Sequence, residues 1–69
     1  MKLHHIMATI TSTELGTIAD FRTADILVDR QTKDNIIEGK QYEELREMEV
    51  VSISVGKEYH DLVILVSAN

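Results

Sequence analysis

The chain has 69 residues, with 7 Lys and Arg against 12 Asp and Glu and a formal net charge of −5. This length accommodates a single small domain, which buries only about 60% of the surface that its unfolded chain exposes. The absence of cysteine excludes disulfides, thiolate zinc sites and cysteine nucleophiles, so a partner subunit is the remaining common way to stabilise so small a core.

The N-terminal residues 2–11 alternate in polarity. Ile6, Ala8 and Ile10 fall on one side, and the other side holds His5, Met7, Thr9 and Thr11. This period of two, with threonine and isoleucine, predicts a strand. An alternative to a native N-terminal strand is that residues 1–5 are partly an expression remnant and that Met7 is the natural start.

Residues 12–22 fit two structures. Leu15, Ile18, Ala19 and Arg22 have helical spacing, and residues 11–14 match a capping box. The same stretch can form a turn around Gly16 and then a strand that carries Thr17, Ala19 and Phe21 inward. We favour the strand, because the threonines and Gly16 weaken a helix.

Two further elements are expected in the middle of the chain. Residues 23–29 alternate again and predict a strand, although Leu27 interrupts its polar face. Residues 31–35 are polar and favour a turn, after which Ile36 and Ile37 begin a short element. Residues 40–48 favour a helix, because Tyr42, Leu45 and Met48 recur at i, i+3 and i+6 among good helix formers.

The C-terminal third predicts a β-hairpin. In residues 51–55, Val51, Ile53 and Val55 alternate with two serines. A polar loop at residues 56–61 contains Gly56 and Asp61, and the apolar run 62–66 follows. Because this run has no polar face, we expect the last strand to be central and buried on both sides, by a helix or by a second subunit.

These elements together predict an α+β, β-rich fold. Its small antiparallel sheet contains an N-terminal strand, one or two middle strands and the C-terminal hairpin. One short helix near residues 40–48, or a second subunit, covers the apolar face of the sheet.

The sequence offers little catalytic or metal-binding chemistry. His4 and His5 point to opposite faces of the expected strand, and a site combining one of them with His60 and Asp61 is conceivable but not required by the spacing. The carboxylates of residues 43–49 are typical of a solvated helix face. No nucleophile elbow and no phosphate-binding loop occurs, so we expect a protein that is not an enzyme and has no cofactor.

The net negative charge disfavours nucleic acid as a partner, because no stripe of Lys and Arg offsets it. The five-residue apolar run 62–66 is far shorter than the about 20 residues that span a bilayer, and no signal peptide is visible in the first ten residues. We therefore expect a cytoplasmic protein with no membrane partner.

Three functional hypotheses follow. The first is a non-catalytic protein-interaction module that forms a homo-oligomer through Leu62, Ile64 and Val66, with Tyr59 as a further contact. The second is an acidic regulator or inhibitor in which Glu43, Glu44 and Glu47 bind a basic partner or mimic nucleic acid. The third is a ligand-dependent or metal-dependent activity at His60 and Asp61.

Overall fold

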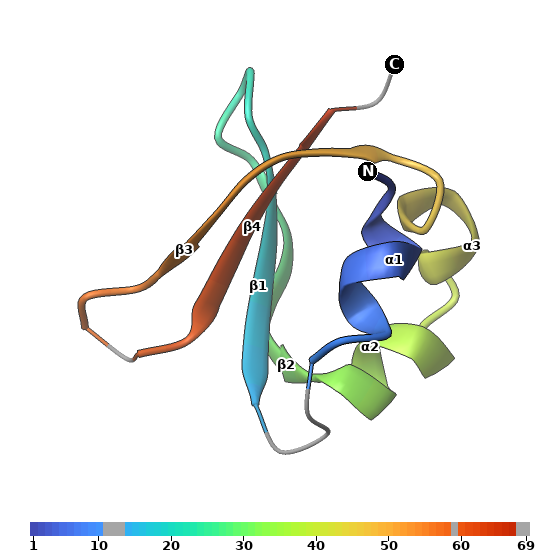
Figure 1. Cartoon of the computed structure of the whole chain (residues 1–69), viewed down its shortest axis with the longest axis horizontal. Helices are drawn as coiled ribbons and strands as arrows, with labels where there is room; N and C mark the ends of the chain where they lie inside the picture. Colours follow the sequence, from blue (N-terminus) through green and yellow to red (C-terminus); the bar gives the residue numbers. More distant parts are fainter. Residues whose placement is uncertain (11–13, 59, 68–69) are drawn as a thin grey trace.

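The computed structural model describes residues 1–10, 14–58 and 60–67 and contains three short helices and four strands (Figure 1). The helices are α1 (Leu3–Met7), α2 (Lys33–Glu38) and α3 (Tyr42–Leu45). The strands are β1 (Leu15–Asp20), β2 (Ile26–Thr32), β3 (Glu49–Val55) and β4 (Leu62–Ser67). The strands form one sheet, and the helices lie together on one side of it. The expected strand-rich α+β class is confirmed.

The sheet is mixed, not antiparallel as expected. Its strand order is β2-β1-β4-β3, and β1 and β4 are parallel, whereas the two outer pairs are antiparallel. The apolar strand β4 is therefore paired on both edges, with β3 on one side and with β1 on the other. Ile18 lies beside Ile64 in this parallel pair, and both side chains are fully buried.

The C-terminal hairpin is present, with β3 beginning at Glu49 rather than at residue 51. Ile53 pairs with Ile64 and Val55 with Leu62, and the register shifts once, between Val50 and Ser52. The expected central position of the last strand is confirmed by the strand order.

The prediction of an N-terminal strand is wrong, because residues 3–7 form helix α1. Leu3 and Met7 are 0% and 2% exposed, and Ile6 and Ile10 pack against the same core. These four residues stand at i, i+3, i+4 and i+7, which is the spacing of an amphipathic helix. The burial of these four apolar side chains favours the helix more strongly than the alternation of Ile6, Ala8 and Ile10 favours a strand.

Of the two structures that fit residues 12–22, the described part adopts the strand, as β1. The next strand, β2, begins at Ile26 and runs three residues past the expected end at residue 29. Its pairing with β1 contains two register shifts, and Arg30 lies in the left-handed region at φ 45°. These irregularities explain why Leu27 packs against the core despite its place in the alternation.

The expectation of one helix is also corrected, because α2 forms where a polar turn was expected. The Thr32 hydroxyl accepts a hydrogen bond from the Asn35 backbone N–H at 3.3 Å, which caps the start of this helix. Helix α3 is shorter than the predicted residues 40–48. Its apolar face is as expected, since Leu45 is buried and Tyr42 and Met48 pack against the core.

The core lies between the helices and one face of the sheet. It contains one or two side chains from nearly every element, namely Leu3, Met7, Ile18, Val28, Ile36, Leu45, Ile64 and Val66. No helix in the described ranges is long and apolar enough to cross a bilayer.

Candidate interaction surface

The two sides of strand β4 have different surroundings. Ile64 and Val66 point toward the helices and are 0% exposed, so these two predicted interaction residues belong to the core of the protomer. The prediction is corrected for them, because their side chains are covered by the chain's own helices and cannot contact a partner. Leu62, at the start of the strand, is half-buried.

The opposite side of the sheet carries no helix among the described residues. Val63 and Leu65 of β4 point to this side and are half-buried. In the neighbouring strands the exposed side chains of Leu15 and Ile26 share it, as the alternation of β1 and the pairing of Ala19 with Ile26 require. The last strand was predicted to be covered on both sides. Within the protomer, the helices cover only the side that carries Ile64 and Val66.

The exposed apolar side chains of the hairpin gather on β3. Val51, Ile53 and Val55 are 49%, 45% and 60% exposed. Ile53 and Val55 lie on the side of the sheet that bears the helices, because they pair with Ile64 and Leu62. At this end, however, β3 extends away from the helices (Figure 1). The sequence pattern marked these residues as the apolar face of a strand, but it could not show that no helix reaches them.

The N-terminal residues cover the first part of the outer edge of β3. The Val50 N–H donates to the Met1 carbonyl at 2.8 Å, and Leu3 N–H donates to the Met48 carbonyl at 2.9 Å. Lys2 and Glu49 form an isolated antiparallel bridge. At the other end of the strand, the Gly56 N–H donates to the Asp61 carbonyl at 2.7 Å and turns the chain toward β4. In the part of the chain that the structure describes, no backbone pairs with the outer edge of residues 51–55.

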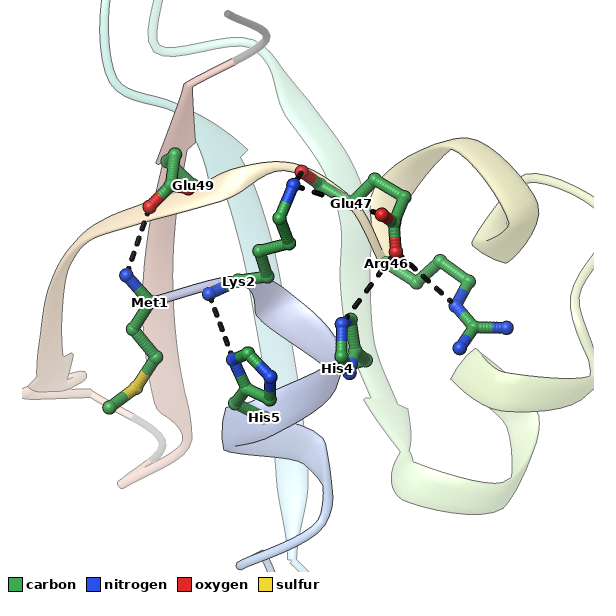
Figure 2. A network of polar contacts seen from close by, with 7 residues as sticks. All are labelled: Met1, Lys2, His4, His5, Arg46, Glu47 and Glu49. Atoms are coloured by element: carbon green, nitrogen blue, oxygen red, sulfur yellow. Dashed lines mark hydrogen bonds and ion pairs between the residues drawn. The ribbon is translucent and has the colours of Figure 1, made fainter.

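Figure 2 shows the polar contacts that hold the N-terminus on this edge. The Met1 ammonium donates to the Glu49 carboxylate at 2.9 Å. This hydrogen bond and the positive charge of the ammonium lower the pKa of Glu49 from its ordinary value of 4.5, with smaller contributions from Lys2 and His5. The His5 Nδ1 accepts the Lys2 backbone N–H at 3.3 Å, which caps helix α1.

The predicted acidic surface is divided. The carboxylate of Glu47 lies 3.7 Å from Lys2 Nζ, 3.6 Å from His4 Nε2 and 3.8 Å from Arg46 Nε (Figure 2). Glu47 is thus engaged by basic side chains of its own chain. Glu43 and Glu44 are exposed in the first turn of α3.

A buried polar contact joins the hairpin loop to β1. The Thr17 hydroxyl donates to Asp61 Oδ2 at 2.6 Å and accepts the Arg30 backbone N–H at 3.2 Å. Thr17 and Asp61 are both only 7% exposed. A Cβ atom on Gly56 would overlap Asp61 Oδ1, so any larger residue there would have to displace the buried Asp61 carboxylate. Asp61 therefore acts as a structural residue that fixes the loop, the central sheet and β2 together.

The histidines are not assembled into a ligand set in the structure. His4 and His5 lie on α1 with ring centroids 4.1 Å apart, so their expected placement on opposite faces of a strand is wrong. His60, exposed in the hairpin loop, has φ 55°. Within residues 1–10, 14–58 and 60–67, no group of three or more His, Asp or Glu side chains is placed to hold a metal ion. Tyr59, the predicted further contact, lies outside the described residues.

An open groove of about 310 Å³ lies between β2 and helix α2. Its walls include Leu27, Val28, Gln31, Ile36 and Gln41, and Asp29 is the one carboxylate among its lining residues. The Gln41 side chain already donates to the Leu27 carbonyl at 2.9 Å. The groove therefore brings together no acid–base pair and leaves few polar groups for a ligand.

The apolar edge of β3 is accordingly the main candidate surface, and the half-buried Val63 and Leu65 form a second apolar area on the helix-free side. Comparisons of the chain with protein-family models, with curated proteins and with solved structures give no match.

Proposed function

We propose that the protein is a small, non-catalytic interaction module that associates with copies of itself. The observation that carries this proposal is the exposure of Val51, Ile53 and Val55 in an edge strand. Exposed apolar edge strands pair readily with other chains, and soluble proteins usually protect them. A chain of 69 residues also has too little core to bury these residues by itself.

The physical benefit of self-association is twofold. Transfer of apolar side chains out of water contributes roughly 25 cal/mol for each Å² buried, and association links the stability of the fold to the concentration of the protein. No membrane partner and no oxidising compartment is needed, and we place the protein in the cytoplasm, where chains without disulfides are common.

Light scattering coupled to size-exclusion chromatography tests the proposal, with the protein loaded at concentrations from about 1 µM to about 1 mM, which bracket weak to moderate affinities. The expected result is a mass that rises from 7.8 kDa toward an oligomer as the concentration increases. A fully folded monomer over the whole range would contradict the proposal.

A further inference from the structure

We infer that two copies of the chain pair through their β3 edges, antiparallel and centred on Ile53, to give a continuous eight-stranded sheet. This inference rests on the proposed self-association and adds the interface, its register and the size of the assembly. The observations that carry it are the limits of the open edge, its sequence and the contrast with the opposite edge of the sheet.

The first observation is that the free edge has two defined ends. Met1 pairs with Val50 at one end, and the turn at Gly56 closes the other. Between them lie residues 51–55, which contain neither charge nor proline. Charged residues and proline are the usual means of preventing edge pairing, and this segment has neither. The one register shift of β3 falls between Val50 and Ser52, at the first residue of this segment, and residues 52–55 pair regularly with β4.

The second observation is that the free segment is a palindrome, Val-Ser-Ile-Ser-Val. An antiparallel pair with Ile53 on the two-fold axis places Val51 opposite Val55 and Ser52 opposite Ser54 of the second copy. Ile53 then meets Ile53 of the second copy on the side that bears the helices, and serines meet serines on the other side. Aliphatic pairs and serine pairs are favourable cross-strand neighbours. A two-fold interface requires this self-complementarity, whereas an unrelated peptide does not. The sequence therefore selects a second copy as the occupant.

The third observation explains how the partner strand fits beside the N-terminus. In this register, Gly56 of the second copy comes opposite Val50, where Met1 already lies. The partner chain turns at that residue toward its own β4, on the far side from the interface. The five-residue segment is thus the longest stretch that two copies can pair without displacing residues 1–3.

The assembly stops at two copies, because the other edge of the sheet is unsuitable for pairing. Strand β2 contains two register shifts and a left-handed residue, Arg30, and it presents Asp29 and Arg30 in its middle. Bulges and charges of this kind block the addition of a strand. With one open edge per protomer, the two-fold pairing closes on itself and forms no filament.

Single-cysteine variants test the register directly, since the natural chain has no cysteine. Directly opposite residues of antiparallel strands lie within the Cα separation that a disulfide needs. Oxidation of Ile53→Cys is therefore expected to give a covalent dimer on a non-reducing denaturing gel. A mixture of Ser52→Cys and Ser54→Cys is expected to cross-link, because these positions are opposite each other. Val51→Cys is the matched control and stays monomeric, since its two copies are about 13 Å apart along the strands.

A second variant tests the interface without cross-linking. Ile53→Lys places two like charges on the two-fold axis and is expected to weaken the dimer by at least about tenfold, with an unchanged circular dichroism spectrum because Ile53 is already 45% exposed. Ile26→Lys, an exposed residue of β2, is the matched control and leaves the dimer intact.

The outcomes separate the two proposals. A wild-type monomer at every concentration overturns both. A wild-type oligomer that survives Ile53→Lys, or in which Ile53→Cys fails to cross-link, overturns the β3 pairing and leaves self-association standing. An assembly larger than a dimer contradicts the closed two-fold arrangement.

Discussion

The two edges of the sheet are built differently. Strand β2 shifts register twice against β1 and carries charges and a left-handed residue in its middle, whereas the free part of β3 is uncharged and alternates aliphatic residues with serines. Proteins protect an edge with the features that β2 shows. Residues 51–55 contain no charge and no left-handed residue, and their one register shift lies at Val51. This indicates an edge that is kept available for pairing, and variants at each edge test how it is maintained.

Deletion of residues 1–6 is expected to have the largest effect. It removes the fully buried Leu3 from the core and also uncovers the β3 edge at Val50. Loss of a buried leucine alone costs about 2–5 kcal/mol, which is a large part of the stability of so small a domain. Thermal unfolding followed by circular dichroism should show a much lower midpoint or no transition.

Leu3→Ala is the control for this deletion, because it removes the core contact and keeps Met1 and Lys2 on the edge. It should lose stability without gaining a tendency to aggregate. A deleted chain as stable as the full chain would contradict the role of residues 1–6 in the core and on the β3 edge.

Thr17→Val is expected to disturb the β2 edge. The substitution leaves the buried Asp61 carboxylate and the Arg30 backbone N–H without the hydroxyl that each of them contacts. Loss of such a partner costs about 1–3 kcal/mol in the free energy of unfolding, measurable by urea denaturation. Thr17→Ser keeps the hydroxyl and should retain most of the stability. A Thr17→Ser protein that loses more stability than Thr17→Val would mean that the methyl group, and not the hydrogen bonds, matters.

Gly56→Ala tests the turn that ends the β3 edge. The new methyl group would overlap the Asp61 carboxylate, and such overpacking typically costs about 1–3 kcal/mol. Gly39→Ala is the matched control, because its Cβ would meet its neighbours at 3.4 Å and its φ of −69° suits alanine. A Gly56→Ala protein as stable as Gly39→Ala would contradict the described position of Asp61.

A smaller effect is expected at the Met1 end of the edge. Because the ammonium of Met1 lowers the pKa of Glu49 in the folded protein, this contact stabilises the fold above the unfolded value of 4.5. The contribution is lost as the pH falls through the lower, folded pKa. Both groups are exposed, so the effect is small and weakens with added salt.

Urea denaturation of the wild type and Glu49→Gln at several values between about pH 7 and about pH 3 measures this contribution. The two proteins should differ slightly at neutral pH and converge in acid. A difference that stays constant over this range would show that the carboxylate charge has no part in it.

The C-terminal part of the fold was predictable because its signals are local. Alternation in residues 51–55 and the apolar run 62–66 identify the hairpin, and the apolar character of both sides of β4 indicates its central position. The N-terminal helix was missed because residues 2–11 satisfy two periods at once. The spacing of Leu3, Ile6, Met7 and Ile10 was available in the sequence, and so was the Thr32 cap of α2.

Other features depend on tertiary structure and had no local signal. The parallel pairing of β1 with β4 depends on the packing of Ile18 and Ile64 under the helices. The sequence predicted one helix, whereas the described residues form three. For the same reason Ile64 and Val66 were assigned to the interaction surface, although helices cover them. The alternation of Val51, Ile53 and Val55 predicts the apolar face of a strand. That no helix covers this face is seen only in the structure, where β3 extends away from the helices.

The most direct test of the β3 pairing is an isotope-filtered nuclear Overhauser experiment on a mixture of labelled and unlabelled protein at a concentration where the dimer forms. The account predicts intermolecular contacts between Ile53 and Ile53 and between Val51 and Val55. A dimer whose intermolecular contacts arise instead from Val63 and Leu65 on the helix-free side would contradict it.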